Sequence, residues 1–171
     1  DRVYVGQIAN NLIFNITSHG IYANQVGQFA ILALDSNLVY NCTGSGIYTM
    51  QTMSFNSVKG NTIYLVQNGL YLYANNYFSV ANFSDNRIFS YSLQGIYCKY
   101  LWNTTIENNL IYGCTGSVSS TYGIQIYNDN LYSNTIKNNT VYNGGYYGIY
   151  GNRTTGSWRN NIVTGSTYGF R

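Results

Sequence analysis

The sequence predicts an all-β solenoid of about seven coils, with roughly 25 residues in each coil. Two short markers recur at that period. The first is Asn-x-Ile or Asn-x-Val, whose successive asparagines are 26, 24, 25, 23, 30 and 22 residues apart. The second is a glycine followed by an apolar residue, usually as Gly-Ile-Tyr. No stretch shows the apolar periodicity over 10–12 residues that a helix needs.

Each unit has room for three short strands, because its apolar runs are rich in Ile, Val, Tyr and Phe and end at Asn, Gly, Ser or Thr. Each strand then pairs in parallel with its equivalent one coil on. The inward residues of the strand after the asparagine are Ile13, Val39, Ile63, Ile88, Ile111, Val141 and Val163. Those after the glycine are Ile21, Ile47, Leu70, Ile96, Ile124, Ile149 and Phe170. Those of the remaining strand are Ile8, Leu34, Val58, Phe83, Ile106, Ile136 and Trp158.

Strand alternation places the residues next to these inward positions on the outside, where they form two aromatic stripes. The first stripe contains Phe14, Tyr40, Tyr64, Phe89, Tyr112 and Tyr142. The second contains Tyr22, Tyr48, Tyr71, Tyr97 and Tyr150. Exposed stacked aromatics can bind sugars or a neighbouring protein, and they can also simply cover one another along the solenoid.

The marker asparagines predict an internal ladder. Asparagine tolerates left-handed backbone and bonds neighbouring backbone groups, so it suits a tight turn between strands. Side chains in register can also hydrogen-bond to one another from coil to coil. The predicted ladder residues are Asn11, Asn37, Asn61, Asn86, Asn109, Asn139 and Asn161. We interpret them as structural and not as a binding site.

These two columns resemble the right-handed parallel β-helix repeat proteins of the pectate-lyase-like superfamily. The resemblance covers nearly the whole chain, from about Ile8 to Phe170. It implies a right-handed parallel β-helix with an asparagine ladder. It implies less about function, because that superfamily includes polysaccharide lyases and hydrolases, phage tailspikes, adhesins and metal-site maturation proteins.

Composition agrees with one β-helix domain spanning residues 1–171. Proline is absent, as expected where every N–H is needed by the next coil, and the glycines are expected at turns with positive φ. A net charge of +3 without a dense basic stripe argues against nucleic-acid binding. No apolar run is long enough to span a membrane. The chain opens at Asp1, so we expect either a removed leader or an excised piece. Separately, the predicted location is outside the cell or on its surface.

Acidic residues are too dispersed to favour an enzyme. Glycoside hydrolysis needs two carboxyl groups about 5–10 Å apart. Only Asp85 and Glu107 lie in adjacent coils and adjacent columns, with Arg87 beside them, so this group is the alternative catalytic site. One further column alternates in charge and predicts the coil-to-coil pairs Asp35 with Lys59 and Glu107 with Lys137.

Soft metal ligands are also dispersed, and we predict neither a metal site nor a cofactor. A Cu(I) site would have to draw on His19, Cys42, Met50, Met53, Cys98 and Cys114, which show no dense spacing. Buried cysteine and methionine commonly fill space in a core. Cys98 and Cys114 lie in neighbouring coils, so a disulfide and two free thiols both remain open.

Two local features complete the pattern. Six Asn-x-Ser/Thr sequons are potential glycosylation sites, namely Asn15, Asn41, Asn82, Asn103, Asn138 and Asn152. The longest unit carries extra residues at 116–121, which predict a loop that bulges from one turn. An insertion of this kind is either a local functional element or a tolerated surface loop.

Together these observations favour a non-enzymatic extracellular β-solenoid that acts as a structural or adhesive module and assembles end to end. The end-to-end expectation rests on the open strand edges of a solenoid, which template further pairing. The alternatives are a carbohydrate-binding or polysaccharide-degrading β-helix protein and a tailspike-like host-binding fragment.

Overall fold

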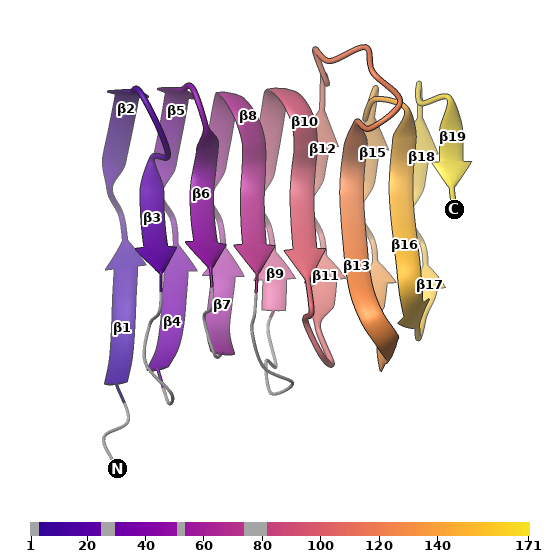
Figure 1. Ribbon diagram of the computed structural model, residues 1–171, viewed down its shortest axis with the longest axis horizontal. Coiled ribbons are helices and arrows are strands. Elements are labelled where there is room, and N and C mark those ends of the chain that lie inside the picture. The colour runs from indigo at the N-terminus through magenta and orange to yellow at the C-terminus, as the bar shows by residue number, and fades with distance from the viewer. Residues whose placement is uncertain (1–3, 25–29, 51–53, 74–81) are drawn as a thin grey trace.

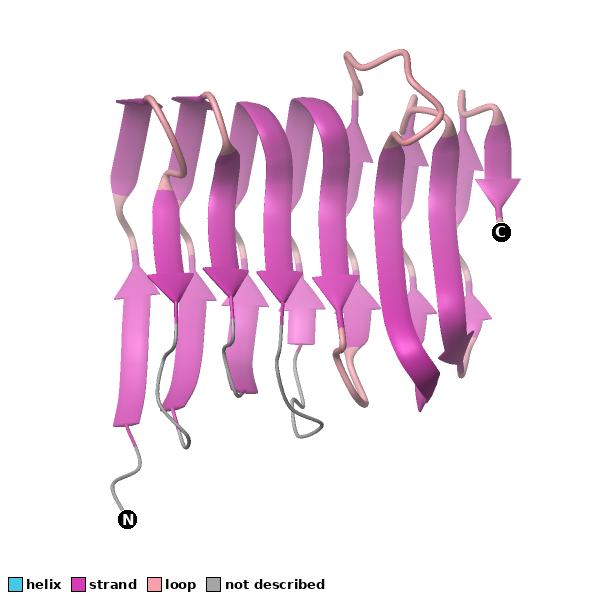
Figure 2. Cartoon of the chain, viewed as in Figure 1, coloured by secondary structure: helices cyan, strands magenta, loops and turns pink. Residues whose placement is uncertain are grey.

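A computed structural model of the chain describes residues 4–24, 30–50, 54–73 and 82–171. The described part is a stack of β-strand coils without helices, and Figures 1 and 2 show its long axis running from the first coil to the last. Every strand pair is parallel. The predicted β-solenoid of roughly 25-residue turns is confirmed.

Each coil contributes to three faces, named here after the view in Figure 1. The lower sheet has the order β1 (Tyr4–Ala9), β4 (Ala30–Asp35), β7 (Ser54–Lys59), β9 (Asn82–Ser84), β11 (Thr105–Glu107), β14 (Thr135–Lys137) and β17 (Trp158–Arg159). The upper face contains β2 (Leu12–Ile16), β5 (Leu38–Cys42), the starts of β8 (Thr62–Tyr73) and β10 (Arg87–Lys99), β12 (Leu110–Tyr112), β15 (Thr140–Tyr142) and β18 (Ile162–Thr164). The front face contains β3 (Ile21–Asn24), β6 (Ser45–Met50), the ends of β8 and β10, β13 (Tyr122–Ser133), β16 (Tyr147–Thr155) and β19 (Tyr168–Phe170).

The strand register matches the columns read from the sequence. On the upper face Ile13 pairs with Val39 and Val39 with Ile63, and on the front face Ile47 pairs with Leu70. The inward side chains at Val39, Ile63, Ile88, Ile111 and Val141 are all fully buried. Branched apolar side chains therefore fill the coil interior in continuous rows, as the alternation of each strand requires.

The turn into the upper face corrects one part of the ladder interpretation. The left-handed backbone lies one residue before each ladder asparagine, for example at Asp85 (φ 58°) and Asn108 (φ 55°). The whole left-handed column is Asn10, Ser36, Gly60, Asp85, Asn108, Asn138 and Asn160. None of the ladder residues has a positive φ, so what repeats at these positions is the hydrogen bonding of the asparagine and not a left-handed backbone.

The marker glycines are needed for space and not for positive φ. A Cβ atom built on Gly95 would lie 2.6 Å from the carbonyl oxygen of Gly123 and 2.5 Å from Cγ2 of Ile111. Gly113, by contrast, has φ of 68° and meets only the backbone N of Ser90 at 3.8 Å. The two kinds of glycine thus answer different needs, close coil approach in one case and a left-handed turn in the other.

The charged column pairs as predicted in register, but one ion pair goes elsewhere. Lys137 Nζ lies 2.9 Å from Glu107 Oε2. Lys59 is the register partner of Asp35, yet its Nζ lies 3.9 Å from Asp85 in the following coil. The Asp35 carboxylate instead accepts bonds from the Ser57 hydroxyl at 2.7 and 2.8 Å and from the Lys59 backbone N–H at 3.1 Å. Local hydroxyl and backbone donors thus replace the ammonium.

Candidate functional site

The asparagine ladder runs without a break through the corner between the lower sheet and the upper face. Each Nδ2 donates to Oδ1 of the next ladder residue at 2.9–3.0 Å. Asn86 illustrates the full pattern. Its Nδ2 donates to Val58 O at 2.8 Å and to Asn109 Oδ1 at 2.9 Å, and its Oδ1 accepts from the backbone N and Nδ2 of Asn61. These amides are occupied by the coil neighbours, which confirms the predicted ladder.

The first aromatic row lies on the upper face. Phe14, Tyr40, Tyr64, Phe89 and Tyr112 stack in sequence, with ring centroids 4.7–5.3 Å apart and ring planes within 2–8° of parallel. Tyr142 takes the next register position and is 57% exposed.

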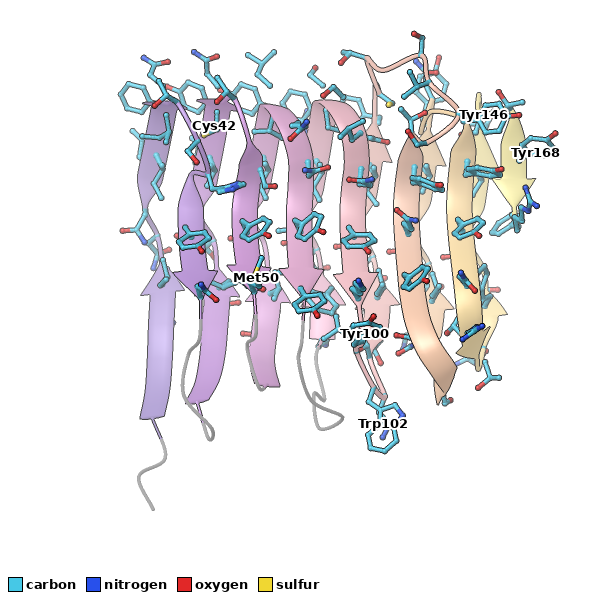
Figure 3. All side chains as sticks on the ribbon, viewed as in Figure 1. Cys42, Met50, Tyr100, Trp102, Tyr146 and Tyr168 are labelled. Carbon is cyan, nitrogen blue, oxygen red and sulfur yellow. The ribbon has the colours of Figure 1, made fainter. Side chains whose placement is uncertain are left out.

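The second aromatic row lies on the front face and is visible as a line of rings in Figure 3. Tyr22, Tyr48, Tyr71 and Tyr97 follow one another at 5.6, 4.8 and 4.6 Å between centroids. The register partner of Tyr97 in the next coil is Gln125, which ends the row. Tyr150 follows Gln125 in register and contacts Tyr122 and Tyr147 instead.

Ring orientation limits what these rows can bind. Successive rings cover each other's faces, so the inner members present mainly ring edges to solvent. A sugar that stacks on an aromatic platform needs an open ring face. Both rows therefore contribute to coil packing, where each stacked pair adds roughly 0.5–1.5 kcal/mol beyond area burial.

The group Asp85, Glu107 and Arg87 is not gathered around one point. Asp85 is an exposed turn residue that faces Lys59, whereas Glu107 binds Lys137 and accepts a bond from Asn82 Nδ2 at 3.3 Å. The hydrogen bond from Lys137 lowers the pKa of Glu107 below its ordinary value, which is opposite to what a general acid needs. Arg87 lies over the rings of Phe89 and Tyr112 and donates to the Tyr112 hydroxyl at 2.8 and 3.2 Å.

The three cysteines are free thiols in different settings. Cys98 is buried on the front face, where burial raises the pKa of its thiol well above the ordinary value. Cys114 takes the place that Tyr91 occupies one coil earlier, since each lies two residues after the paired Tyr112 and Phe89. Seven residues of strand therefore separate the columns of Cys98 and Cys114. The disulfide alternative is thereby excluded in favour of free thiols.

A polar groove of about 400 Å³ crosses the corner between the upper and front faces. Its lining residues are Asn41, Cys42, Thr43, Leu65, Val66, Gln67, Ser90, Ser92 and Thr115. Leu65 is unusual here, because it is 53% exposed and has φ of 53°. The same turn position elsewhere holds Asn15, Asn41, Ser90, Gly113, Asn143 and Gly165. A branched apolar side chain in left-handed backbone is strained by roughly 1–2 kcal/mol. Because the Leu65 side chain is largely exposed, burial of apolar surface does not offset this strain.

The predicted loop at residues 116–121 lies at the same corner, beside the groove, and rises above β12 and β13 in Figure 1. It borders a smaller cavity of about 210 Å³, whose lining includes Cys114, Val118, Thr121 and Tyr146. The Thr121 hydroxyl donates to Val118 O at 2.8 Å and accepts from Tyr146 N at 2.8 Å, which ties the loop to the next coil.

The sequon asparagines differ in their accessibility. Asn15, Asn41, Asn82, Asn103 and Asn138 are exposed, and Asn152 is partly buried. The Asn41 amide donates to Asn15 Oδ1 at 2.6 Å, which is a coil-to-coil amide bond like those of the ladder but on the outer surface. Glycan attachment at these residues stays a prediction.

Sequence reasoning missed one cluster on the front face. The ammonium of Lys99 lies 5.2, 4.7 and 5.5 Å from the ring centroids of Tyr73, Tyr100 and Tyr127. Tyr73, Lys99 and Tyr127 are register partners, each four residues after a marker glycine. That shared offset is the signal that would have found the cluster.

Comparison with known proteins adds a family to this geometry. A family model described as periplasmic copper-binding protein (NosD) matches residues 10–166. The chain belongs to the NosD family. No curated protein and no solved structure matched it. Membership supports a β-helix repeat protein and, in a coarse sense, a location outside the cytoplasm. In the part of the chain that the structure describes, no helix is long and apolar enough to cross a bilayer.

The described residues do not fit the copper site that the NosD name implies. They contain no group of three or more His, Cys, Asp or Glu side chains placed to hold a metal ion. His19 Nδ1 already accepts the backbone N–H of Ser45 at 3.0 Å. Figure 3 shows Cys42 at the upper corner and Met50 near the lower end of β6, so these soft ligands do not converge. Met53 lies outside the described residues.

Proposed function

We propose that the chain is a non-enzymatic structural module outside the cytoplasm, a rigid β-solenoid that carries surface loops and corners. One observation supports this most directly. The polar groups that could act in binding or catalysis are instead bonded to neighbouring coils. They include the ladder amides and the carboxylates of Asp35 and Glu107. A repeated scaffold of this kind is suited to holding a surface at a fixed distance and orientation.

Polysaccharide cleavage assays test this proposal. We expect no cleavage of acidic or neutral polysaccharides, with or without added Ca²⁺, and no change for Asp85→Asn. Glu107→Gln serves as the second variant. Cleavage that is abolished by Asp85→Asn or Glu107→Gln, while circular dichroism shows an intact fold, would overturn the proposal of a non-enzymatic structural module.

Copper binding is tested separately. The described soft ligands lie apart, so we expect the protein to retain no stoichiometric Cu(I) or Cu(II) against a chelator during dialysis. His19→Gln and Cys42→Ser are the informative variants. Retained copper that is lost in either variant would show that the ligands converge in solution.

A second candidate function, favoured by the polar groove, is binding of a neutral carbohydrate. The groove is uncharged, and the side chains of Thr43, Gln67, Ser90 and Ser92 make no hydrogen bond within the described structure. Such amides and hydroxyls match sugar hydroxyls, and exposed Leu65 offers the apolar contact that sugar C–H groups need. The strain at Leu65 is then explained by a partner.

Calorimetry with neutral oligosaccharides tests this candidate. Leu65→Asn and Gln67→Ala should abolish any binding, whereas Leu110→Asn, which changes an exposed leucine outside the groove, should retain it. Leu65→Asn also restores the residue found at Asn15 and Asn41, so the fold should be kept. Binding that survives both groove variants would place the site elsewhere.

Self-association belongs to the same proposal. In the described sheets the edge strands are β1, β2 and β3 in the first coil and β17, β18 and β19 in the last coil. Edge strands present N–H and C=O groups that can pair with another copy. Sedimentation of the protein should show axial oligomers whose proportion rises with protein concentration. A strictly monomeric protein at high concentration would contradict end-to-end self-association.

A further inference from the structure

The upper face carries most of the large apolar side chains that are exposed in the described structure. Its strands follow one another from the first coil to the last (Figure 1), and their outward residues form two columns. One column holds the first residue of each strand, and the other holds the ring two residues later. Six side chains of these columns are between 37% and 61% exposed, namely Leu12, Phe14, Leu38, Leu110, Tyr142 and Ile162. Among the described side chains of the lower sheet, no large apolar one is exposed to this degree.

The apolar area of the upper face is large enough for a protein interface. These six side chains leave roughly 600 Å² open on one copy, if a large side chain contributes about 200 Å² when fully exposed. The edges of the partly buried rings between them add to this area, which come from Tyr40, Tyr64, Phe89 and Tyr112. A contiguous apolar patch of this size is at the upper limit for a monomeric protein. Two such faces in contact would bury roughly 1,200 Å², which is within the range of specific protein interfaces.

The charge of the upper face favours a second copy of the chain as its partner. Arg87 is the only charged residue on this face within the described strands. Its guanidinium lies over the Phe89 and Tyr112 rings and donates to the Tyr112 hydroxyl, so the charge lies against the face. A membrane surface would be matched by a cluster of basic residues, and a sugar by open ring faces. Apolar rows without a charge pattern fit another apolar face, and a second copy supplies one.

We propose that the upper face is the contact surface of a face-to-face dimer of this chain. Two β-sheets that pack face to face keep their strand directions within about 30° of each other and lie about 10 Å apart. A two-fold axis parallel to the solenoid axis places the first column of one copy against the ring column of the other, with equivalent coils opposed. Leu38 then packs against the partner's Tyr40, and Arg87 meets the partner's Phe89.

A two-fold axis across the solenoid would instead reverse the order of the coils. Strand β10 is the fourth of the seven described strands on this face, so it would meet its own copy and oppose Arg87 to the partner's Arg87. Like charges opposed at an interface are unfavourable, so the arrangement with equivalent coils together is preferred. This contact uses no strand edge and closes after two copies, so it goes beyond the end-to-end association proposed above.

Charge placed on the upper face tests the dimer. Leu38→Glu and Tyr142→Glu each put an unpaired carboxylate into the contact, in inner coils away from the edge strands. Each should raise the dissociation constant of the dimer, measured by sedimentation equilibrium, about tenfold or more. Gln125→Glu places the same charge on the front face and should leave the dissociation constant unchanged. Circular dichroism checks the fold, and Leu38→Gln and Tyr142→Gln replace a glutamate variant that does not fold.

Two outcomes of these measurements would overturn the dimer. One is a protein that stays monomeric at high concentration. The other is association that survives both folded upper-face variants, which would support end-to-end contact alone. Conversely, loss of all association in these variants would support the dimer and contradict end-to-end contact, so the two proposals fail separately.

Single cysteines test which coils meet. In a Cys114→Ser background, which removes the thiol that is not buried, Leu38→Cys and Thr140→Cys lie in the second and sixth coils. Each variant should cross-link to its own copy through a short bis-maleimide, because equivalent coils are opposed. Cross-linking only in a mixture of the two variants would overturn this arrangement. We also expect no flotation with phosphatidylcholine vesicles, and flotation that Leu38→Glu abolishes would overturn the dimer in favour of a lipid surface.

Discussion

The inner corner and the outer faces of this solenoid hold successive coils together by different means. Inside, seven ladder asparagines are identical in every coil, and each step uses directional bonds of 2.9–3.0 Å. Outside, the aromatic rows accept Phe or Tyr, and they end at residues such as Gln125 and Thr164. Directional buried bonds allow only one side chain, whereas stacking tolerates several. Strict repetition in a column therefore marks a bonding requirement more than surface use.

The largest expected effect comes from the glycines that allow coils to approach. Gly95→Ala should lower the free energy of unfolding by more than about 3 kcal/mol, because a new Cβ meets a backbone oxygen that cannot move aside. Gly113→Ala should cost only about 1 kcal/mol, because the left-handed backbone is strained but the space is open. Urea denaturation measures both. Equal losses would mean that coil spacing yields more readily than the geometry indicates.

Removal of one ladder amide should have the next largest effect. Asn86→Ala should cost about 2–3 kcal/mol, since it leaves buried partners on Asn61, Asn109 and Val58 without their bonds. Asn24→Ala is the control, because Asn24 is exposed on the front face and should lose less than about 0.5 kcal/mol. A similar loss at both positions would contradict an energetic role for the ladder.

Substitutions in the aromatic rows should destabilise the fold less than those at the marker glycines or in the ladder. Tyr64→Ala removes the ring that stacks on two neighbours and should lower the free energy of unfolding by about 1–2 kcal/mol, whereas Tyr64→Phe should change it by no more than about 0.5 kcal/mol. The same urea measurement applies. If Tyr64→Phe proved as harmful as Tyr64→Ala, the hydroxyl and not the ring would be the contributing group.

A fall in pH should produce the smallest change in the free energy of unfolding, and this change should be a loss of stability. Burial lowers the pKa of His19 below its ordinary 6.5, and Nδ1 accepts the Ser45 N–H, so the fold prefers neutral imidazole. The unfolded chain then binds the proton more readily, and stability that is complete above about pH 7 should fall as the pH drops below about 6.5. His19→Gln should remove this dependence. Urea midpoints of both proteins between neutral and mildly acidic pH measure it, and parallel curves would contradict the prediction.

A second, more acidic step has a different origin. The bond from Lys137 lowers the pKa of Glu107, so the stability from that pair is present above the ordinary 4.5 and is lost as pH falls through the folded value. Lys137→Met should remove this step while leaving the His19 step in place.

Much of the fold could be predicted because each column repeats one residue type. The spacing of Asn61, Asn86 and Asn109 fixes the register, and alternation within each strand then assigns inside and outside. Side-chain contacts were harder to predict at positions where the residue type changes from coil to coil. Register aligned Lys59 with Asp35, but the long flexible side chain of Lys59 extends to Asp85 instead, and backbone pairing does not choose between the two carboxylates.

The candidate sites were less predictable than the fold for the same reason. The tyrosine columns were evident in the sequence, yet whether rings present faces or edges depends on side-chain rotation. The groove depends on how a corner is shaped by unlike residues, among them Leu65, which departs from the Asn, Ser and Gly residues of its own column. The marker glycines were assigned to turns by their general preference, whereas the contact of Gly95 with Gly123 O becomes evident only when coils are stacked.

The narrow range of sequence separation between paired residues has a consequence for folding kinetics. Ladder partners are 22–30 residues apart in sequence wherever they occur along the chain. The loop that must close to add a coil therefore stays within this narrow range at every step, and a longer solenoid would not need longer closures. The unfavourable event is the first pair of coils, which has no template. Each later coil docks on an existing edge, so folding should nucleate once and then propagate along the axis.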